Sequence, residues 1–296
     1  MTKTKATLIG LIAIVLWSFI VALIRVVSEN FSAVGGAALM YTVASIFLLF
    51  SIGFPTIHHF PKKYLLVGAV LFVAYEICLA LSIGYAKSSR QAIEVGMINY
   101  LWPTLTIIAS ILFNQQKTTW LVIPGFIISM VGITWVLGDE GGLNFSLMFT
   151  NIQSNPISYI LAFVGAIIWS AYCVVTAKYA KGKNGITLFF MLVALTLWIQ
   201  YAFVGTNEFN FTLKSTIYLL LAASALGFGY AAWNVGILHG NVMILATASY
   251  FIPIFSAFFA AIVLGATLSW GFWQGVIMIC IGSLCCFVAT RSGKLG

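Results

Sequence analysis

Glu76 is the residue whose type and position point most directly to chemistry, because it is the acidic residue that lies deep inside a long apolar stretch. A charged carboxylate at the centre of a bilayer costs roughly 2.5–3.5 kcal/mol on insertion scales. Such a group is expected to face a watery cavity or to be protonated, since apolar surroundings favour the neutral form. Glu76 is therefore a candidate cation site, proton carrier or counter-charge for a substrate amino group. A structural carboxyl group bonded to a neighbouring helix is the alternative.

Aromatic residues are dense, at 15% of the chain, and several lie within long apolar stretches. Trp17, Tyr100 and Trp169 fall near the centres of such stretches, whereas membrane-interface belts place aromatic residues at the ends. Aromatic walls can stack on a flat ligand, or hold an organic cation by cation–π attraction worth about 2 kcal/mol when desolvated. Packing bulk between helices is the alternative for any single ring. The candidate substrate-binding residues are Trp17, Glu76, Asn99, Tyr100, Trp102, Trp169, Tyr172, Tyr230, Trp233, Asn234 and Tyr250.

Pro103 and Pro253 lie in the middle of two long apolar stretches. Each proline removes a backbone donor and clashes with the carbonyl four residues earlier, at Asn99 and Ser249 respectively. The polar side chains of those two residues are expected to meet backbone groups that the prolines leave free. The two prolines are candidate hinges for gating, and a static kink is the alternative.

The composition identifies the class of protein that must hold these residues. The chain has 296 residues, of which 62% are hydrophobic and 7% charged, against about 25% charged in soluble proteins. This excludes a soluble enzyme, a disordered chain and a nucleic-acid-binding domain, and predicts an all-α integral membrane protein. Ten apolar stretches reach the roughly 20 residues of a transmembrane helix. They are Ala6–Val27, Ser32–Phe54, Tyr64–Gly84, Ala92–Phe113, Thr119–Leu137, Pro156–Tyr179, Ile186–Val204, Thr216–Leu238, Val242–Leu264 and Trp270–Thr290.

The basic residues predict the orientation of these spans, because Lys and Arg collect in cytoplasmic loops. With the N-terminus in the cytoplasm, the inner segments hold Lys3, Lys5, Lys62, Lys63, Lys117, Lys178, Lys181, Lys183, Arg291 and Lys294. The outer segments then hold Arg25, Lys87, Arg90 and Lys214, and the acidic residues Glu29, Glu94, Asp139, Glu140 and Glu208. Arg90 and Glu94 are spaced to pair on one helix turn, and we expect them in a solvated outer connection. Both termini are predicted to be cytoplasmic.

The two halves of the chain resemble each other. The segment Asn99–Pro103 corresponds to Ser249–Pro253, and Trp17-Ser18 corresponds to Trp169-Ser170. The glycines Gly125 and Gly132 correspond to Gly275 and Gly282; we expect them to be notches for helix packing, with dimerisation as an open alternative. Each half contains five spans, which is an odd number, so the second half must enter the membrane from the opposite side to the first. This predicts two inverted repeats at 1–140 and 155–292, an arrangement typical of secondary transporters.

These paired features resemble the EamA-type exporters of the drug/metabolite transporter superfamily. The features are the small residue–Tyr–x–x–Pro in the fourth and ninth spans and the Gly-x6-Gly in the fifth and tenth. Trp17-Ser18 and Ile98–Pro103 are most similar to the enterobacterial exporters of aromatic amino acids and methyl viologen. The resemblance implies a bacterial inner-membrane protein with a central cavity lined by spans one to four and six to nine, leaving five and ten peripheral.

The favoured hypothesis is a secondary exporter of aromatic amino acids that works by alternating access, with other neutral amino acids left open as further substrates. A multidrug or organic-cation exporter coupled to protons through Glu76 is the alternative, and a membrane enzyme or scaffold without transport activity is the third. The sequence contains no Gly-x4-Gly-Lys phosphate loop and no metal-ligand spacing, so we expect no cofactor and no metal. The expected partners are a small-molecule substrate and the lipid bilayer, without nucleic acid. We expect a monomer, with a dimer left open.

Overall fold

The computed structural model describes residues 1–138, 142–204 and 209–292. Asp139, Glu140, Glu208 and Lys294, and the end of the first predicted repeat, lie outside these residues. The described residues form helices and contain no strand, which confirms the all-α prediction. The α-helices are α1 Lys3–Ser18, α2 Ile20–Phe31, α3 Ala33–Ser51, α4 Ala69–Gly84, α5 Ser89–Asn99, α6 Trp102–Asn114, α7 Val122–Gly138, α8 Phe145–Ser154, α9 Pro156–Tyr179, α10 Ile186–Val204, α11 Leu213–His239, α12 Val242–Ser249, α13 Ile252–Leu264 and α14 Trp270–Ser292. Short helical turns lie at Ile57–His59 and, as a π-helix, at Tyr64–Gly68.

Seven helical stretches among the described residues are long and apolar enough to cross a membrane. They are Ala33–Ser51, Tyr64–Gly84, Ser89–Asn114, Pro156–Tyr179, Ile186–Phe203, Leu213–His239 and Trp270–Thr290. Two bent pairs, α1 with α2 and α12 with α13, raise the number to as many as nine. The apolar helix α7 occupies the position of the remaining expected span but is shorter than these. A multi-pass helical protein is therefore established, and ten spans stay a prediction.

The first expected span, Ala6–Val27, is not one continuous helix. It is split at Phe19 into α1 and α2, which meet at 44°. The Phe19 N–H bonds to the carbonyl of Leu16, three residues back, and the ring of Phe19 stacks on Phe259 of α13 at 4.1 Å. Ser18 also donates to the carbonyl of Ile14, a pattern that often bends a helix. The break thus comes from local hydrogen bonding and a tertiary contact that the hydropathy does not record.

Both central prolines lie directly after helix breaks. The helix before Pro103 ends at Asn99, and the helix before Pro253 ends at Ser249. Ser249 donates to the carbonyl of Ala246, which the N–H of Tyr250 leaves for Thr247, so this side chain meets a backbone group freed by the helix break and not by Pro253. The Asn99 side chain does not, because its amide donates to the hydroxyl of Tyr75 instead.

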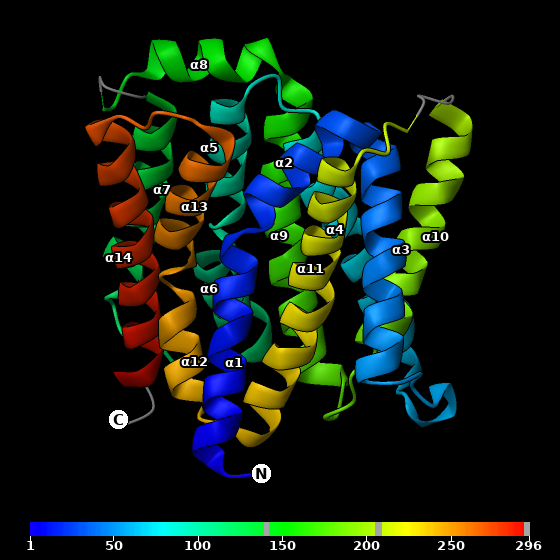
Figure 1. Ribbon diagram of the computed structural model, residues 1–296. Coiled ribbons are helices and arrows are strands. Elements are labelled where there is room, and N and C mark those ends of the chain that lie inside the picture. Colours follow the sequence, from blue (N-terminus) through cyan, green and yellow to red (C-terminus); the bar gives the residue numbers. More distant parts are fainter. Residues whose placement is uncertain (139–141, 205–208, 293–296) are drawn as a thin grey trace.

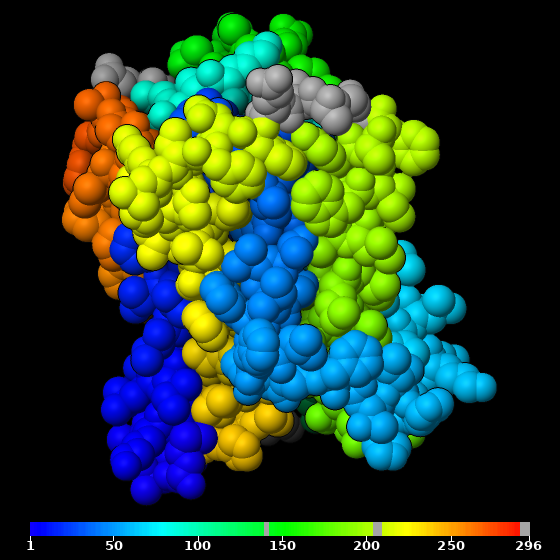
Figure 2. Space-filling model, turned by 45° about the vertical axis from the view of Figure 1, so that its right-hand side comes forward, coloured from blue at the N-terminus to red at the C-terminus, as the bar shows by residue number. Residues whose placement is uncertain are grey.

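The helices pack in four long pairs (Figure 1): α1 with α11, α4 with α9, α3 with α10, and α7 with α14. The beginning of α1 and the last turns of α14 lie at the same end of the molecule, and α8 lies across the opposite end. Figure 2 shows α3 between α10 and α11 on one outer face. The two members of each pair come from different halves of the chain, so neither half buries its apolar surface alone.

The pair formed by α7 and α14 depends on glycine. A Cβ added at Gly132 would lie 2.8 Å from the carbonyl oxygen of Gly275, and one added at Gly275 would lie 2.8 Å from that of Gly132. A Cβ at Gly282 would lie 2.5 Å from the carbonyl oxygen of Gly125. Small residues at these positions let the two backbones touch. The expectation that these glycines are notches for helix packing is confirmed, and the helix that packs into each notch belongs to the same chain.

Candidate substrate-binding site

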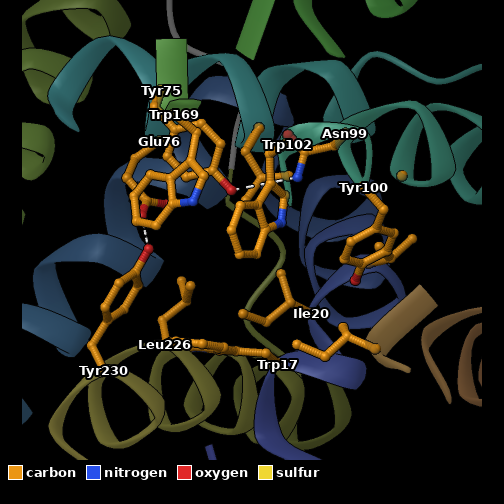
Figure 3. Close-up of a pocket in the computed structure, with 14 residues that line it drawn as sticks. Trp17, Ile20, Tyr75, Glu76, Asn99, Tyr100, Trp102, Trp169, Leu226 and Tyr230 are labelled. Carbon is orange, nitrogen blue, oxygen red and sulfur yellow. Dashed lines mark hydrogen bonds between the residues drawn. The ribbon is translucent and has the colours of Figure 1, made fainter. Parts of the chain in front are cut away.

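Two neighbouring cavities occupy the centre of the helix bundle. The smaller, here called the inner chamber, has a volume of about 70 Å³ (Figure 3). Its lining comprises Trp17, Ile20, Val21, Tyr75, Glu76, Leu79, Gly96, Asn99, Tyr100, Trp102, Trp169, Leu226, Tyr230 and Ile252. The larger, here called the vestibule, measures about 490 Å³ and is lined mostly by residues of α9, α11 and the segment between α9 and α10, together with Trp17, Tyr64 and Ile186. The vestibule falls within the usual 300–1,000 Å³ of ligand pockets, whereas the inner chamber holds about two water molecules.

Three aromatic side chains separate the two cavities, because Trp17, Trp169 and Tyr230 line both. The ring centroid of Tyr230 lies 5.1 Å from that of Trp17 and 6.3 Å from that of Trp169. Trp17 fits against α11 because residue 229 is glycine: a Cβ there would lie 2.6 Å from the Trp17 Nε1. These three rings form the constriction between vestibule and inner chamber.

Glu76 is completely buried on α4 and faces the inner chamber. The Tyr230 hydroxyl donates to its Oε1 at 2.6 Å, and the Tyr41 hydroxyl donates to its Oε2 at 2.6 Å. The carboxyl group thus joins α4 to α11 and to α3. Sequence reasoning missed Tyr41, and the only signal was a tyrosine within an apolar stretch.

The vestibule carries a nearly continuous aromatic wall. The Trp169 ring lies 4.4 Å from Tyr75 and stacks on Tyr172 at 5.0 Å, which confirms that residues three apart on this helix are neighbours. On the opposite helix, Trp233 lies 5.3 Å from Trp17. Sequence reasoning did not anticipate Lys181 and Lys183, which line the vestibule from the segment after α9. The vestibule can therefore offer stacking surfaces together with positive charge.

The predicted binding residues fall into three groups. The inner chamber is lined by Trp17, Glu76, Asn99, Tyr100, Trp102, Trp169 and Tyr230, and the vestibule additionally by Tyr172, Trp233 and Asn234. Tyr250 lines neither cavity. Its ring instead packs on Phe287 of α14 at 5.4 Å, because the break after Ser249 directs it toward the outer helix pair.

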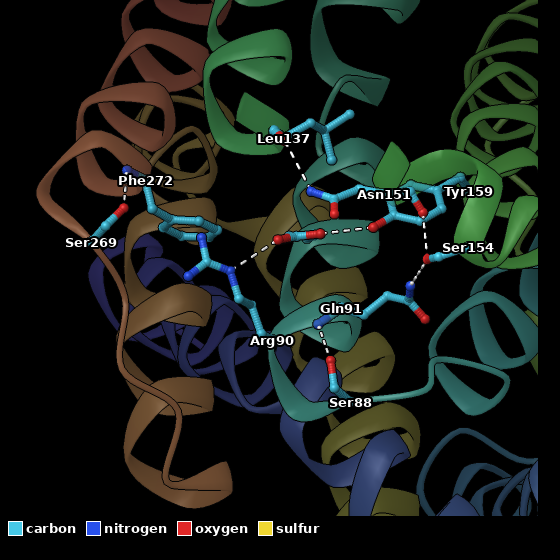
Figure 4. A network of polar contacts seen from close by, with 10 residues as sticks. Ser88, Arg90, Gln91, Leu137, Asn151, Ser154, Tyr159, Ser269 and Phe272 are labelled. Atoms are coloured by element: carbon cyan, nitrogen blue, oxygen red, sulfur yellow. Dashed lines mark hydrogen bonds and ion pairs between the residues drawn. The ribbon is translucent and has the colours of Figure 1, made fainter. Parts of the chain in front are cut away.

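Glu94 is a second buried acid, and the expectation that it lies in a solvated connection is wrong. It is 3% exposed within α5, where Arg90 Nε lies 3.1 Å from its Oε1 and the Tyr159 hydroxyl donates to its Oε2 at 2.7 Å (Figure 4). Gln91 donates to the Ser154 hydroxyl at 3.2 Å beside this contact. Helix α9 begins at Pro156, three residues before Tyr159, and Ser154 is the last residue of α8, so the bonds tie the neighbouring ends of α5, α8 and α9 together. They lie at the end of the molecule opposite the beginning of α1.

The chain is similar to two bacterial proteins over nearly its whole length. It is 57% identical over 293 residues to the aromatic amino acid exporter YddG of Escherichia coli (strain K12), covering 99% of this chain and 100% of that one. It is 56% identical over 291 residues to the aromatic amino acid exporter YddG of Salmonella typhimurium (strain 14028s / SGSC 2262), covering 98% and 99%.

A solved structure and a family match agree with these relatives. One crystal structure superposes with a TM-score of 0.68 at 20% identity, covering 98% of this chain and 99% of that chain, and so shares the fold. The EamA-like transporter family matches residues 4–138 and 156–288. These two segments make up most of the chain, and the chain therefore belongs to the EamA-like transporter family.

Proposed function

We propose that this protein exports aromatic amino acids across a bacterial inner membrane. The observation that carries the proposal is the aromatic vestibule of about 490 Å³, which leads to a buried carboxyl group. The relatives at 57% and 56% identity are named aromatic amino acid exporters. Ligand pockets of this size combine stacking surfaces with a few polar groups that orient the ligand, and this vestibule has both.

The proposed architecture is ten membrane spans in two inverted repeats at 1–140 and 155–292, with α7 as the fifth span. The packing supports it. In the proposed repeats, α1 corresponds to α9, α3 to α10, α4 to α11 and α7 to α14. When each helix is replaced by its counterpart, the α1–α11 pair becomes the α9–α4 pair, and the pairs α3–α10 and α7–α14 are unchanged. Such exchange is what a two-fold axis in the membrane plane requires. Both termini are cytoplasmic, and the chain acts as a monomer in the bilayer.

The substrate ring stacks in the vestibule between Trp169 and Trp233, and the ammonium group points through the constriction toward Glu76. Lys181 and Lys183 attract the carboxylate at the entrance. In this conformation the inner chamber is too small for an aromatic amino acid, so the ring of Tyr230 moves aside before the substrate advances. Asn99 and Tyr100 then contact the substrate from the other side.

The conformation is open toward the cytoplasm. The vestibule is lined by the residues Ile237 and Leu238 at the end of α11, which lies beside the beginning of α1 through the bond from the Asn241 N–H to Thr7. The opposite end is closed by the contacts of Glu94. The helix breaks before Pro103 and Pro253 act as hinges. Movement about them closes the cytoplasmic end of the cavity and opens the opposite end, which gives alternating access.

The test is transport of labelled phenylalanine by purified protein in proteoliposomes, with and without a pH gradient. We expect saturable phenylalanine flux that Trp169→Ala reduces and that Trp120→Ala, which alters a 73% exposed ring, leaves unchanged. Absence of flux with folded protein in both conditions would overturn the proposal. Flux without a gradient would exclude obligatory proton coupling.

Export of organic cations coupled to protons through Glu76 is the second candidate, and the buried carboxylate at the inner chamber favours it. The same vesicles separate the two candidates by replacing phenylalanine with methyl viologen. The second candidate requires methyl viologen flux that depends on the pH gradient and that loses this dependence in Glu76→Gln. Phenylalanine flux without any methyl viologen flux would reject it.

A further inference from the structure

A groove of about 430 Å³ runs between α6 and α9 on the outside of the bundle. It lies on the face of α9 turned away from the vestibule: Ala171, Val174 and Val175 line the groove, whereas Tyr172 and Cys173 line the vestibule. Its walls are apolar, and two of the residues that form them, Leu112 and Ile167, are 68% and 46% exposed. The groove therefore opens toward the surroundings of the helix bundle, which in the membrane are lipid.

The groove has the length of one membrane leaflet. Along α6 it extends from Leu105 to Asn114, which at 1.5 Å per residue is about 14 Å. The hydrocarbon core of a bilayer is about 30 Å thick, so half of it is about 15 Å. A single acyl chain that runs from the membrane surface to the midplane matches this length.

One end of the groove is basic. Lys178 and Tyr179 line it there, and the Nζ atoms of Lys63 and Lys178 each lie 5.7 Å from the centre of the Tyr179 ring. The ion pairs among the described residues join Arg25 to Glu29 and Arg90 to Glu94, and neither lysine takes part in one. The sequence has no acidic residue between Glu29 and Glu76 or between Glu140 and Glu208 that could neutralise them.

We propose that this groove binds an anionic phospholipid of the cytoplasmic leaflet, with an acyl chain along α6 and α9 and the phosphate between Lys63 and Lys178. The apolar groove of one-leaflet length fits the chain. Lys178, which lines its end, and Lys63, which lies near the same Tyr179 ring, fit the phosphate. Basic pockets between transmembrane helices on the cytoplasmic side bind anionic headgroups in this manner. The site is separate from the vestibule and independent of which substrate is carried.

Native mass spectrometry of the purified full chain, titrated with phosphatidylglycerol or phosphatidylcholine, tests the site. Removing one lysine near an anionic phosphate is expected to weaken phosphatidylglycerol binding about fivefold, and removing both about 25-fold. The variants are Lys178→Ala alone and combined with Lys63→Ala, and phosphatidylcholine binding stays unchanged in both. Lys214→Ala and Lys3→Ala are matched single-charge controls outside the groove, expected within about twofold of the unaltered protein.

Ala171→Leu fills the groove without changing charge and is expected to weaken binding of both lipids. Glycerol phosphate, which has no acyl chains, is expected not to compete. Phosphatidylglycerol binding that survives the double lysine variant, or survives Ala171→Leu in folded protein, would overturn the site. Full competition by glycerol phosphate would reassign it to a free anion, and a dimer that Ala171→Leu dissociates would reassign it to a second copy of the chain.

Discussion

Replacing Tyr230 with phenylalanine tests whether Glu76 carries a negative charge. Both of its tyrosine hydrogen bonds measure 2.6 Å. A carboxylate accepts at both oxygens, and hydrogen bonds that two hydroxyl groups donate to it favour its charged form. We therefore expect an ionised Glu76 that the two hydroxyls stabilise inside the bundle.

The energy of the hydrogen bond between Tyr230 and Glu76 distinguishes an ionised Glu76 from a neutral one. A hydrogen bond to a charged group contributes roughly 1.5–3 kcal/mol, whereas neutral side-chain bonds inside a membrane protein average about 0.6 kcal/mol. Tyr230→Phe removes only the hydroxyl, because the ring that lies 5.1 Å from Trp17 remains. We expect the free energy of unfolding to fall by about 2 kcal/mol.

The assay is reversible unfolding in mixed micelles, applied to Tyr230→Phe, Glu76→Gln and the double variant. The double-mutant cycle isolates the interaction between the two residues, and we expect a coupling energy of about 2 kcal/mol. Tyr250→Phe is the matched control, since its ring packs on Phe287, and we expect a change within about 0.5 kcal/mol. A coupling energy at or below about 0.6 kcal/mol would refute an ionised Glu76 held by Tyr230.

Three further predictions concern the aromatic wall, the breaks and the outer pair. Trp169→Ala removes the ring between Tyr75 and Tyr172 and is expected to weaken phenylalanine binding about tenfold, measured by equilibrium binding of labelled phenylalanine; unchanged affinity would exclude this ring from the site. The double variant Pro103→Ala and Pro253→Ala is expected to slow transport about tenfold or more at equal expression, and unchanged vesicle flux would contradict the hinges. Gly132→Leu must displace a backbone 2.8 Å away and is expected to lower the free energy of unfolding by about 1–3 kcal/mol, whereas stability equal to the unaltered protein would contradict the close contact.

The amino-acid sequence alone determined the helical membrane class and the positions of most local features. Long apolar runs leave a chain no way to satisfy its backbone in lipid except as helices, so the class followed from composition. A proline affects only its own helix, so the breaks before Pro103 and Pro253 could be located from sequence. The neighbouring positions of Trp169 and Tyr172 likewise follow from helical spacing.

Only the tertiary structure decided which side chains face one another. These helices are apolar on every side, so their sequences do not indicate which face turns inward and which faces lipid. For that reason the bonds of Glu76 to Tyr41 and Tyr230, from helices far apart in the chain, could not be predicted. The burial of Glu94 depends in the same way on Tyr159 from the other half of the chain. Tyr250 has the residue type and the predicted repeat position of a cavity residue, and only the packing of α13 and α14 turns it away.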